Sequence, residues 1–385
     1  MSQTTEHPMN EFPLMQTAGD NIVLLHPHMP ATAIEAVTEV LKNRWIGQGP
    51  KVEQFEQEFS AKFCQGLPAL AVGSGTDALH LAYLLAGVEA GDEVITPVFT
   101  CTATNIPFLY MRAKVVFADI QADTMNIDPA DVRRRITPKT KAIVCVHYGG
   151  LPCEMAELQS IAREHKLALI EDAAHAVGAA YEGASIGSLS DFTMFSFQAV
   201  KHITTGDGGM VVMKNPDLIE KARRLRWFGI DRKAKQGGIW QNDIKEVGYK
   251  YQMTDIAAAM GLAALAEIDE TLALRRRLFT TYERGLAGIP GVTLVGAQRP
   301  DRVHGAWLCT VLAENRVQLQ AKLREQNIES AQVHYRNDRY SILGGRRPDY
   351  PNMDAVEDRY LVLPLHTKMS LADVERVCRV IRSGW

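Results

Sequence analysis

The sequence predicts an α/β protein with a large domain, built on a mostly parallel central sheet flanked by helices, and a smaller C-terminal α+β domain. Between residues 69 and 213, short apolar runs alternate with helical segments, which is typical of parallel strands joined by crossover helices. The chain has 385 residues, and because this exceeds what one core usually supports, a second domain is expected.

We expect three regions along the chain. Residues 1–20 form a loose N-terminal arm, residues 21–265 form the large domain, and residues 266–385 form the small domain. In the small domain, Val303–Val311 and Tyr360–Leu365 have the composition of strands.

The large domain is expected to open with two helices. Pro30 suits a first helical turn, and apolar residues recur at helical spacing from Ala31. Trp45–Pro50 is rich in turn-forming residues, and a second helix follows over Val52–Phe63.

The predicted sheet starts at Ala69–Val72, which runs into Gly73–Asp77 and then an apolar helix over Ala78–Leu85. Beyond Met213 the pattern is more helical, with one long helix expected over Thr254–Leu274. The other predicted strands are Glu93–Thr96, Lys114–Phe117, Ala142–Val146, Leu167–Ile170, Phe192–Phe197 and Met210–Met213.

Charge argues against a nucleic-acid partner. The net charge is -3, and phosphate-backbone binding normally needs clustered basic residues. Arg133–Arg135 and Arg275–Arg277 are expected to be solvated helix faces.

No apolar stretch reaches the roughly 18 residues of a membrane helix, and Met1–Asn10 lacks a signal-peptide pattern. We therefore expect a cytoplasmic protein without membrane contact.

The six cysteines are scattered without a CxxC pair. In a cytoplasmic chain they are expected to be reduced and mostly buried, so the pattern indicates neither disulfides nor a metal site.

Lys201 lies between an apolar strand-like run and the glycine-rich turn at Gly206–Gly209. A partly buried ammonium is costly to desolvate, so its pKa falls and the neutral amine can form a Schiff base with an aldehyde cofactor. A surface lysine beside a hairpin is the alternative interpretation.

Two earlier stretches fit the same kind of site. Ser74–Thr76 begins a predicted helix, so it forms either an anion site or a plain N-cap made by Ser74 or Thr76. Asp172 follows a buried strand, where its carboxylate either pairs with a cation such as a protonated pyridine nitrogen or caps the next helix.

The carboxyl ends of parallel strands meet at one edge of a sheet, so these stretches are expected to lie together. A phosphate cradle, a strand-end aspartate and a later lysine are the parts needed to hold pyridoxal phosphate.

Over nearly its whole length the chain resembles the DegT-type (DegT/DnrJ/StrS) sugar aminotransferases, pyridoxal-phosphate enzymes of fold type I. The resemblance rests on WIGQGPKVEQFEQEF (Trp45–Phe59), GSGTDAL (Gly73–Leu79), EDAAHAVGA (Glu171–Ala179), FSFQAVKHITTGDGGM (Phe195–Met210), GYKYQMTDIAAAMGL (Gly248–Leu262), His334-Tyr335 and LPLH (Leu363–His366).

The resemblance implies roles for individual residues. Lys201 would be the Schiff-base lysine and the acid/base that moves the proton between cofactor and substrate carbons. Asp172 would pair with the pyridine nitrogen, and His175 would lie against the ring near its hydroxyl. The phosphate would be held by the backbone of Gly75 and Thr76 and by the Ser196 hydroxyl.

Some positions depart from the family pattern. Cys101 stands where the family usually has an aromatic residue that stacks on the cofactor. If the alignment with the family is shifted by two residues, Phe99 takes that position instead. Lys250 and Gln252 stand where Asn and Arg are common, in a loop that in relatives reaches the neighbouring subunit's site. Lys250 is expected to contact the partner's cofactor phosphate, with a surface lysine as the alternative.

The resemblance implies transfer of an amino group from glutamate to a keto sugar, expected to be a nucleotide-linked 4-keto-6-deoxyhexose, for surface polysaccharide or glycoconjugate synthesis. Gln198 stands where many relatives that aminate carbon 4 have His, which leaves carbon 3 open. Some relatives that remove a hydroxyl have His at the lysine position, whereas this chain has Lys201. A dehydratase and a non-catalytic cofactor-binding regulator are the alternatives.

The expected assembly is a homodimer with sites at its interface.

Overall fold

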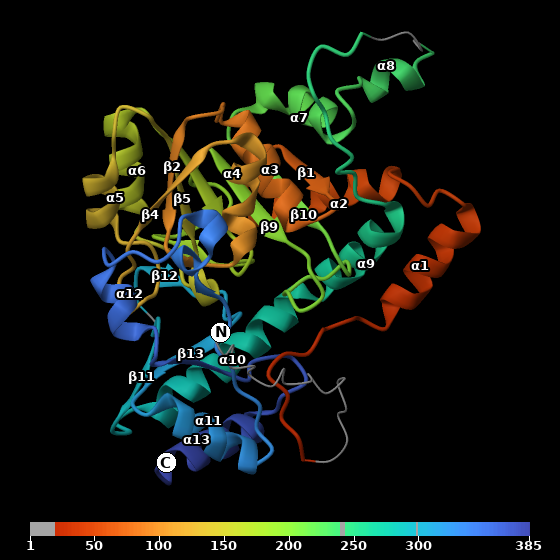
Figure 1. Cartoon of the computed structure of the whole chain (residues 1–385). Coiled ribbons are helices and arrows are strands. Elements are labelled where there is room, and N and C mark those ends of the chain that lie inside the picture. Colours follow the sequence, from red (N-terminus) through yellow and green to blue (C-terminus); the bar gives the residue numbers. More distant parts are fainter. Residues whose placement is uncertain (1–19, 239–242, 298) are drawn as a thin grey trace, which may run out of the picture.

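The computed structural model describes residues 20–238, 243–297 and 299–385 (Figure 1). Except for Asp20, the predicted N-terminal arm therefore lies outside the described residues.

A seven-stranded sheet forms the centre of the large domain. Its strands are β1 (Ala69–Val72), β2 (Glu93–Pro97), β4 (Lys114–Ala118), β5 (Thr140–Val146), β6 (Ala168–Asp172), β9 (Phe192–Ser196) and β10 (Gly209–Met213). Their spatial order is β1-β10-β9-β6-β5-β2-β4. Within this sheet β10 alone runs antiparallel to its neighbours. The predicted mostly parallel sheet is confirmed.

Helices cover both faces of this sheet because its strands alternate their side chains between two cores. Leu70 and Val72 of β1 face one core, and Ala71 faces the other. The core at Leu70 includes α3 (Gly75–Leu85), α4 (Ile106–Met111) and α7 (Ile219–Arg226). The core at Ala71 includes α2 (Pro50–Phe63), α5 (Pro129–Arg135), α6 (Met155–His165) and α9 (Asp255–Ala266).

The C-terminal part has its own core around a three-stranded antiparallel sheet. The strands are β11 (Val292–Leu294), β13 (Cys309–Ala313) and β15 (Tyr360–Leu363), and the helices packed on them are α10 (Ile268–Leu286), α11 (Arg316–Glu325) and α13 (Leu371–Arg382). Ile268 and Leu272 of α10 belong to a core of the large domain, whereas Leu278 belongs to the core of the small domain. The division at residues 265 and 266 remains a proposal.

The remaining elements lie outside these two sheets. The helices are α1 (Thr32–Asn43), α8 (Arg232–Gln236) and α12 (Pro351–Val356), and the short strands are β3 (Phe99–Thr100), β7 (Ala180–Tyr181), β8 (Ala184–Ser185), β12 (Arg302–Val303) and β14 (Tyr335–Arg336).

Two predicted elements were wrong in extent. The single helix expected over Thr254–Leu274 is broken at Glu267, where φ is -101° and ψ is 6°, and α10 then continues to Leu286. The strand expected over Val303–Val311 is interrupted because Ala306 has a left-handed backbone with φ of 53°, so β13 starts only at Cys309.

The prediction that Arg275–Arg277 is a solvated face was wrong for Arg275. This side chain is buried, and its guanidinium donates to the carbonyl oxygens of Ala306, Trp307 and Leu365, each over 3.0 Å. Because α10 runs from the large domain into the small one (Figure 1), one of its faces is enclosed.

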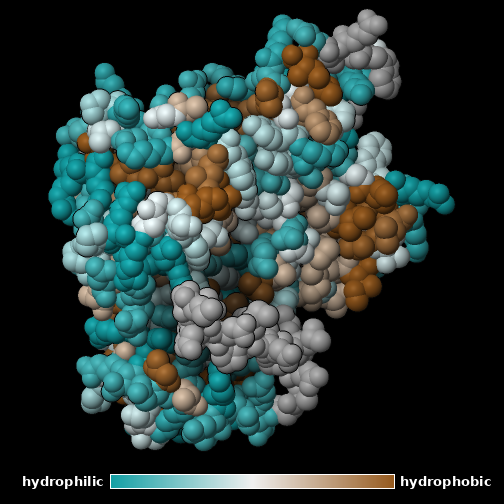
Figure 2. Space-filling model, in the orientation of Figure 1, coloured by the Kyte–Doolittle hydropathy of each residue, from teal (hydrophilic) through white to brown (hydrophobic). Residues whose placement is uncertain are grey.

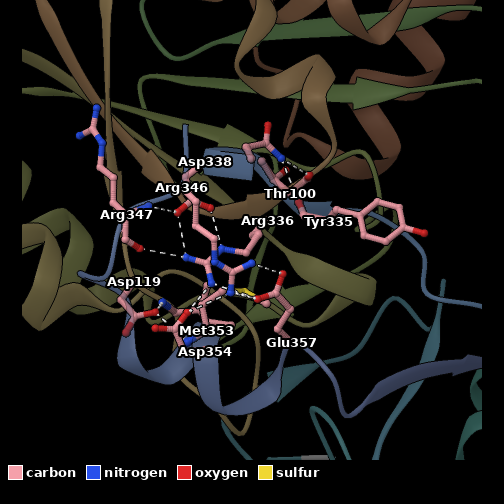
Figure 3. Close-up of polar contacts among 12 residues, drawn as sticks. Thr100, Asp119, Tyr335, Arg336, Asp338, Arg346, Arg347, Met353, Asp354 and Glu357 are labelled. Carbon is pink, nitrogen blue, oxygen red and sulfur yellow. Dashed lines mark hydrogen bonds and ion pairs between the residues drawn. The ribbon is translucent and has the colours of Figure 1, made fainter. Parts of the chain in front are cut away.

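The strand β14 joins the C-terminal part to the large domain by pairing with β3. Arg336 of β14 is 1% exposed, and its guanidinium bonds both carboxylate oxygens of Asp338 over 2.6 and 2.8 Å. Figure 3 shows Asp354 and Glu357 reaching the same guanidinium from the other side. A buried charge is tolerated when it is paired and hydrogen-bonded in this way.

No helix within the described ranges has the length and apolar composition that a membrane span requires.

Candidate active site

Three predicted site segments meet at the carboxyl edge of the central sheet. Asp172 is the last residue of β6, Ser196 is the last residue of β9, and Gly75 begins α3 directly after β1. Since β1, β6 and β9 run in the same direction, these ends lie on one edge, as the sequence predicted.

The start of α3 forms a small cradle. The Ser74 side chain caps the helix by accepting the N–H of Asp77 over 3.1 Å, so the predicted cap exists. The N–H groups of Gly75 and Thr76 remain free of intrahelical partners, as the first turn of a helix requires. A Cβ added to Gly75 would lie 3.2 Å from the Ser196 Oγ atom. The Ser196 hydroxyl therefore faces the positive end of the helix, where an anion is favoured.

Asp172 is buried and held by neutral donors. Its Oδ2 atom accepts the Thr104 hydroxyl over 2.8 Å, and its Oδ1 atom accepts the N–H of Ala174 over 3.2 Å. Burial raises the pKa of Asp172, and these bonds oppose that rise. Among the described residues no ion pair to its carboxylate is found. The site is therefore suited to a cation supplied from outside the chain.

The helix-capping interpretation of Asp172 was wrong. Turns follow it, and the next regular element is the strand β7. The bond to the Ala174 N–H stabilises such a turn.

Lys201 lies in the loop between β9 and β10 and is partly buried. Burial lowers its pKa to about 7, an effect that Cys101 and Asp172 oppose and the Arg275 charge reinforces. Its Nζ atom lies 3.4 Å from the centre of the Trp307 ring. The amine is therefore available in its neutral form near neutral pH, which a solvated surface lysine is not.

His175 is buried beside this lysine. Its ring stacks on Trp307 with centroids 3.8 Å apart and planes inclined by 17°. Burial, and then the charge of Lys201, lower its pKa well below the ordinary value, so the imidazole is neutral. Its Nδ1 atom is buried without a hydrogen-bond partner in the described part of the chain. The His334 ring lies nearly parallel to the His175 ring, with the two centroids 5.3 Å apart.

Sequence reasoning missed Trp307 and Thr104. Trp307 was placed inside a predicted strand, and Thr104 lies in a short 3-10 turn with no recognisable motif. Both reach the site through tertiary packing, and no pattern in the sequence marks them.

Cys101 and Phe99 occupy different environments. Phe99 is buried between the rings of Tyr148 and Tyr360, at 5.0 and 5.1 Å. Cys101 is partly exposed and close enough to Lys201 to influence its pKa. This arrangement favours Cys101 as the residue at the ring face.

Lys250 is exposed and hydrogen-bonds the Gln252 side chain. Its Nζ atom also lies 5.4 Å from the Phe228 ring. The neighbouring Tyr251 carbonyl accepts the N–H of Gly73 over 2.8 Å, so this segment runs beside the start of α3.

A second cluster lies in the buried core at the end of β5. The ligand atoms of Cys145, His147 and Cys153 lie within 4.8 Å of one another. Both His147 nitrogens already have partners: Nδ1 accepts the Cys153 N–H over 3.1 Å, and Nε2 lies 2.9 Å from Glu171 Oε2. The histidine is therefore satisfied as a core residue.

The sequence of this chain matches the model of a known protein family. The DegT/DnrJ/EryC1/StrS aminotransferase family matches residues 27–382. The chain belongs to this family. It is therefore a pyridoxal-phosphate-dependent sugar aminotransferase.

Individual members of the DegT/DnrJ/EryC1/StrS family cover most of the chain. The spore coat polysaccharide biosynthesis protein SpsC of Bacillus subtilis is 36% identical over 91% of this chain and 93% of its own. The sugar aminotransferase CalS13 of Micromonospora echinospora has a TM-score of 0.90, with 32% identity over 94% of this chain and 100% of its own. The PLP-form of Spr1654 from Streptococcus pneumoniae has a TM-score of 0.88, with 30% identity over 94% and 98%.

The residues of this DegT/DnrJ-type chain fit pyridoxal phosphate. A glycine at residue 75 keeps the α3 cradle open beside the Ser196 hydroxyl. The Nδ1 atom of His175 has no hydrogen-bond partner among the described residues, and the Asp172 carboxylate has only neutral donors, so a polar group and a cation from the cofactor would suit them. Lys201 provides a neutral amine beside them.

Proposed function

We propose that this enzyme transfers an amino group from glutamate to a nucleotide-linked 4-keto-6-deoxyhexose, giving an amino sugar for surface polysaccharide or glycoconjugate synthesis. The observation that carries the transaminase chemistry is Lys201, whose lowered pKa and position beside Asp172 suit a nucleophilic amine. The name of SpsC supports the polysaccharide context.

When bound, pyridoxal phosphate supplies an aldehyde that accepts the amino group and an electron-withdrawing ring. Lys201 would bond the aldehyde carbon and, once released, would move a proton as a neutral amine. Asp172 would hold the ring nitrogen in its protonated form, because a buried carboxylate with neutral donors gains most from a cation.

The other predicted residues would hold and orient the cofactor. The N–H groups of Gly75 and Thr76 and the Ser196 hydroxyl would bind the phosphate. The free Nδ1 of His175 would face the ring hydroxyl. The thiol of Cys101 would pack on the ring face.

The enzyme is proposed to act as a homodimer. Apolar side chains on α1 and the turn after it are exposed: Ile34 is 74% exposed, and Trp45 and Ile46 are 55% and 51% exposed. Figure 2 shows apolar surface gathered where α1 lies. A second subunit that covers this surface would remove it from water, and Lys250 would then contact the partner's cofactor phosphate.

The six cysteines are all free thiols. Reduced cysteines are the usual state in the cytoplasm, and we propose that location.

The decisive experiment supplies ¹⁵N-labelled glutamate together with thymidine- or uridine-diphosphate-linked 4-keto-6-deoxyglucose to the cofactor-loaded enzyme. Mass spectrometry of the sugar product is expected to show one added ¹⁵N atom, with release of 2-oxoglutarate. NMR of the product then distinguishes amination at carbon 4 from amination at carbon 3.

The other outcomes are informative. A product that has lost a hydroxyl without gaining nitrogen would indicate a dehydratase. If glutamate removes the cofactor's visible band but neither nucleotide sugar gives a product, glutamate is the amino donor and the proposed 4-keto-6-deoxyhexose is not the acceptor. A cofactor-binding protein that reacts with neither substrate would support the regulatory alternative.

A further inference from the structure

A tryptophan from the C-terminal part of the chain lies against the lysine of the site. The Lys201 Nζ atom is 3.4 Å from the centre of the Trp307 ring, and Trp307 is only 2% exposed. The two residues come from segments far apart in the sequence, since Trp307 precedes β13 in the C-terminal sheet.

The Trp307 indole is fixed from several directions. Its Nε1–H donates to the carbonyl of Val200 over 3.0 Å, one residue before the lysine. The Trp307 backbone N–H donates to Gly149 over 2.9 Å, and its carbonyl accepts from Arg275 over 3.0 Å. Its ring also stacks on His175. These contacts fix the position of the Trp307 indole. The flexible Lys201 side chain is therefore the one of the two that changes conformation.

Two opposing effects act on the amine in this position. Burial favours its neutral form, whereas the face of an indole attracts a cation and favours the ammonium form. Other groups around it act in both directions: the carboxylate of Asp172 and the thiol of Cys101 favour the ammonium, and the guanidinium of Arg275 disfavours it. Among the described residues, three further titratable groups lie close enough for the Lys201 charge to lower their pKa: His175, His202 and His334.

We propose that Trp307 is a positioning residue whose indole face holds the Lys201 amine whenever that amine is not bonded to the cofactor. The proposal rests on the proposed role of Lys201. The released Lys201 amine would then stay at one location, and its protonated form would be stabilised there by the Trp307 ring.

The first test uses the unaltered apoenzyme labelled with ¹³C at the lysine ε-carbons. An amine above an indole places its neighbouring protons in the ring current, so one lysine signal is expected upfield of the others. That signal should be missing in Lys201→Ala and should move when pyridoxal phosphate is added. A Lys201 signal at the position of the solvated lysines would overturn the proposal, without any Trp307 variant being needed.

The second test measures the pKa of the amine in Trp307 variants. The rate at which the apoenzyme captures pyridoxal phosphate is followed from pH 5 to 9, and borohydride reduction with peptide mass analysis confirms attachment at Lys201. Removal of the indole in Trp307→Leu is expected to lower the apparent pKa by on the order of one unit. Trp307→Phe keeps a weaker aromatic face and should fall between Leu and wild type.

Trp385→Phe provides the matched control, because the Trp385 indole also donates its N–H to a carbonyl, that of Glu314, but far from the site. This variant should leave the apparent pKa unchanged. An unchanged pKa in both Trp307 variants would refute the proposal. If wild-type protein attaches the cofactor at another lysine, the proposed role of Lys201 fails instead, and neither test depends on the sugar acceptor.

Discussion

Thr104 donates its hydroxyl to the Oδ2 atom of Asp172 over 2.8 Å, and both side chains are buried. Thr104 also contacts the Thr100 hydroxyl over 2.8 Å, and the Thr100 carbonyl accepts the side-chain amide of Asn337 over 2.7 Å. The carboxylate proposed to hold the cofactor nitrogen is thus connected, through three buried polar contacts, to Asn337, which follows β14 in the C-terminal part.

Removing this hydroxyl should weaken cofactor binding. Thr104→Val leaves Asp172 Oδ2 without its donor, and a hydrogen bond to a charged group contributes about 1.5–3 kcal/mol. We expect the Kd for pyridoxal phosphate to rise about tenfold or more, measured by fluorescence titration of the apoenzyme. Thr96→Val is the control, because that buried hydroxyl donates to Asn105 over 2.9 Å and not to Asp172. Equal effects in both variants would contradict the assignment.

Lys201→Ala should remove turnover while the protein still folds. Loss of a positioned acid/base typically costs on the order of 10²–10⁴-fold in rate, and loss of the covalent attachment adds to this. The measurement is product formation with the ¹⁵N donor. Lys214, an exposed lysine just after β10, provides the control, and Lys214→Ala should retain full activity. Comparable turnover in both variants would rule out the proposed role.

Gly75→Ala should narrow the phosphate cradle. The added Cβ would lie 3.1 Å from the Ser196 Cβ and 3.3 Å from the Met194 Cε atom, so neighbouring side chains must move. We expect roughly tenfold weaker cofactor binding, in line with the loss of one well-placed contact of about 1.4 kcal/mol. Gly47→Ala is the control for the added methyl because nothing in the same subunit lies within 4 Å of its Cβ; since this turn belongs to the proposed subunit interface, the oligomeric state of the variant is checked beside its Kd. An unaltered Kd for Gly75→Ala would place the phosphate elsewhere.

The buried Arg336 cluster should stabilise the fold. Arg336→Met leaves the Asp338 carboxylate buried without its partner, which typically costs about 3–5 kcal/mol. Arg346→Met removes an exposed partner of Glu357 in the same cluster (Figure 3), and such pairs contribute about 0–1 kcal/mol. Urea unfolding should therefore separate the two variants clearly. Similar unfolding midpoints would mean that the Arg336 ion pairs contribute little net stability.

Acid should destabilise the protein through its buried neutral histidines. Burial, followed by the Arg276 charge, lowers the pKa of His304 to about 3, below the ordinary value of about 6.5. Since the folded pKa is the lower one, the stability is present above about pH 6.5 and is lost as pH falls toward 3, by about 1.4 kcal/mol per pH unit.

His304→Asn retains an acceptor for the Ala306 N–H, which donates to His304 Nδ1 over 2.7 Å, but does not titrate. We expect its unfolding free energy to depend less steeply on pH between 6.5 and 4 than that of the wild type. Parallel pH profiles for the two proteins would exclude His304 as a source of the acid sensitivity.

The order of Gly75, Asp172, Ser196 and Lys201 along an α/β pattern was enough to predict the sheet and the shared edge, whereas the family was predicted from the resemblance of longer motifs. Local patterns determine this much, because a buried strand is apolar, a helix start has free N–H groups, and parallel strands end on the same side of a sheet. The same reasoning left Asp172 as either a cation partner or a helix cap; the turn after β6 excludes the cap, and the cation partner stays a proposal.

Tertiary structure decided what the local pattern could not contain. The basic run at Arg275 resembles a solvated helix face, yet α10 passes between two cores and its guanidinium binds three carbonyls there. Trp307 and Thr104 carry no motif, and they reach Lys201 and Asp172 because the small domain and a short turn pack against the sheet edge. Contacts between segments distant in sequence depend on how the chain folds back on itself, so the sequence alone determined the parts of the site, and the packing of the two domains determined their neighbours.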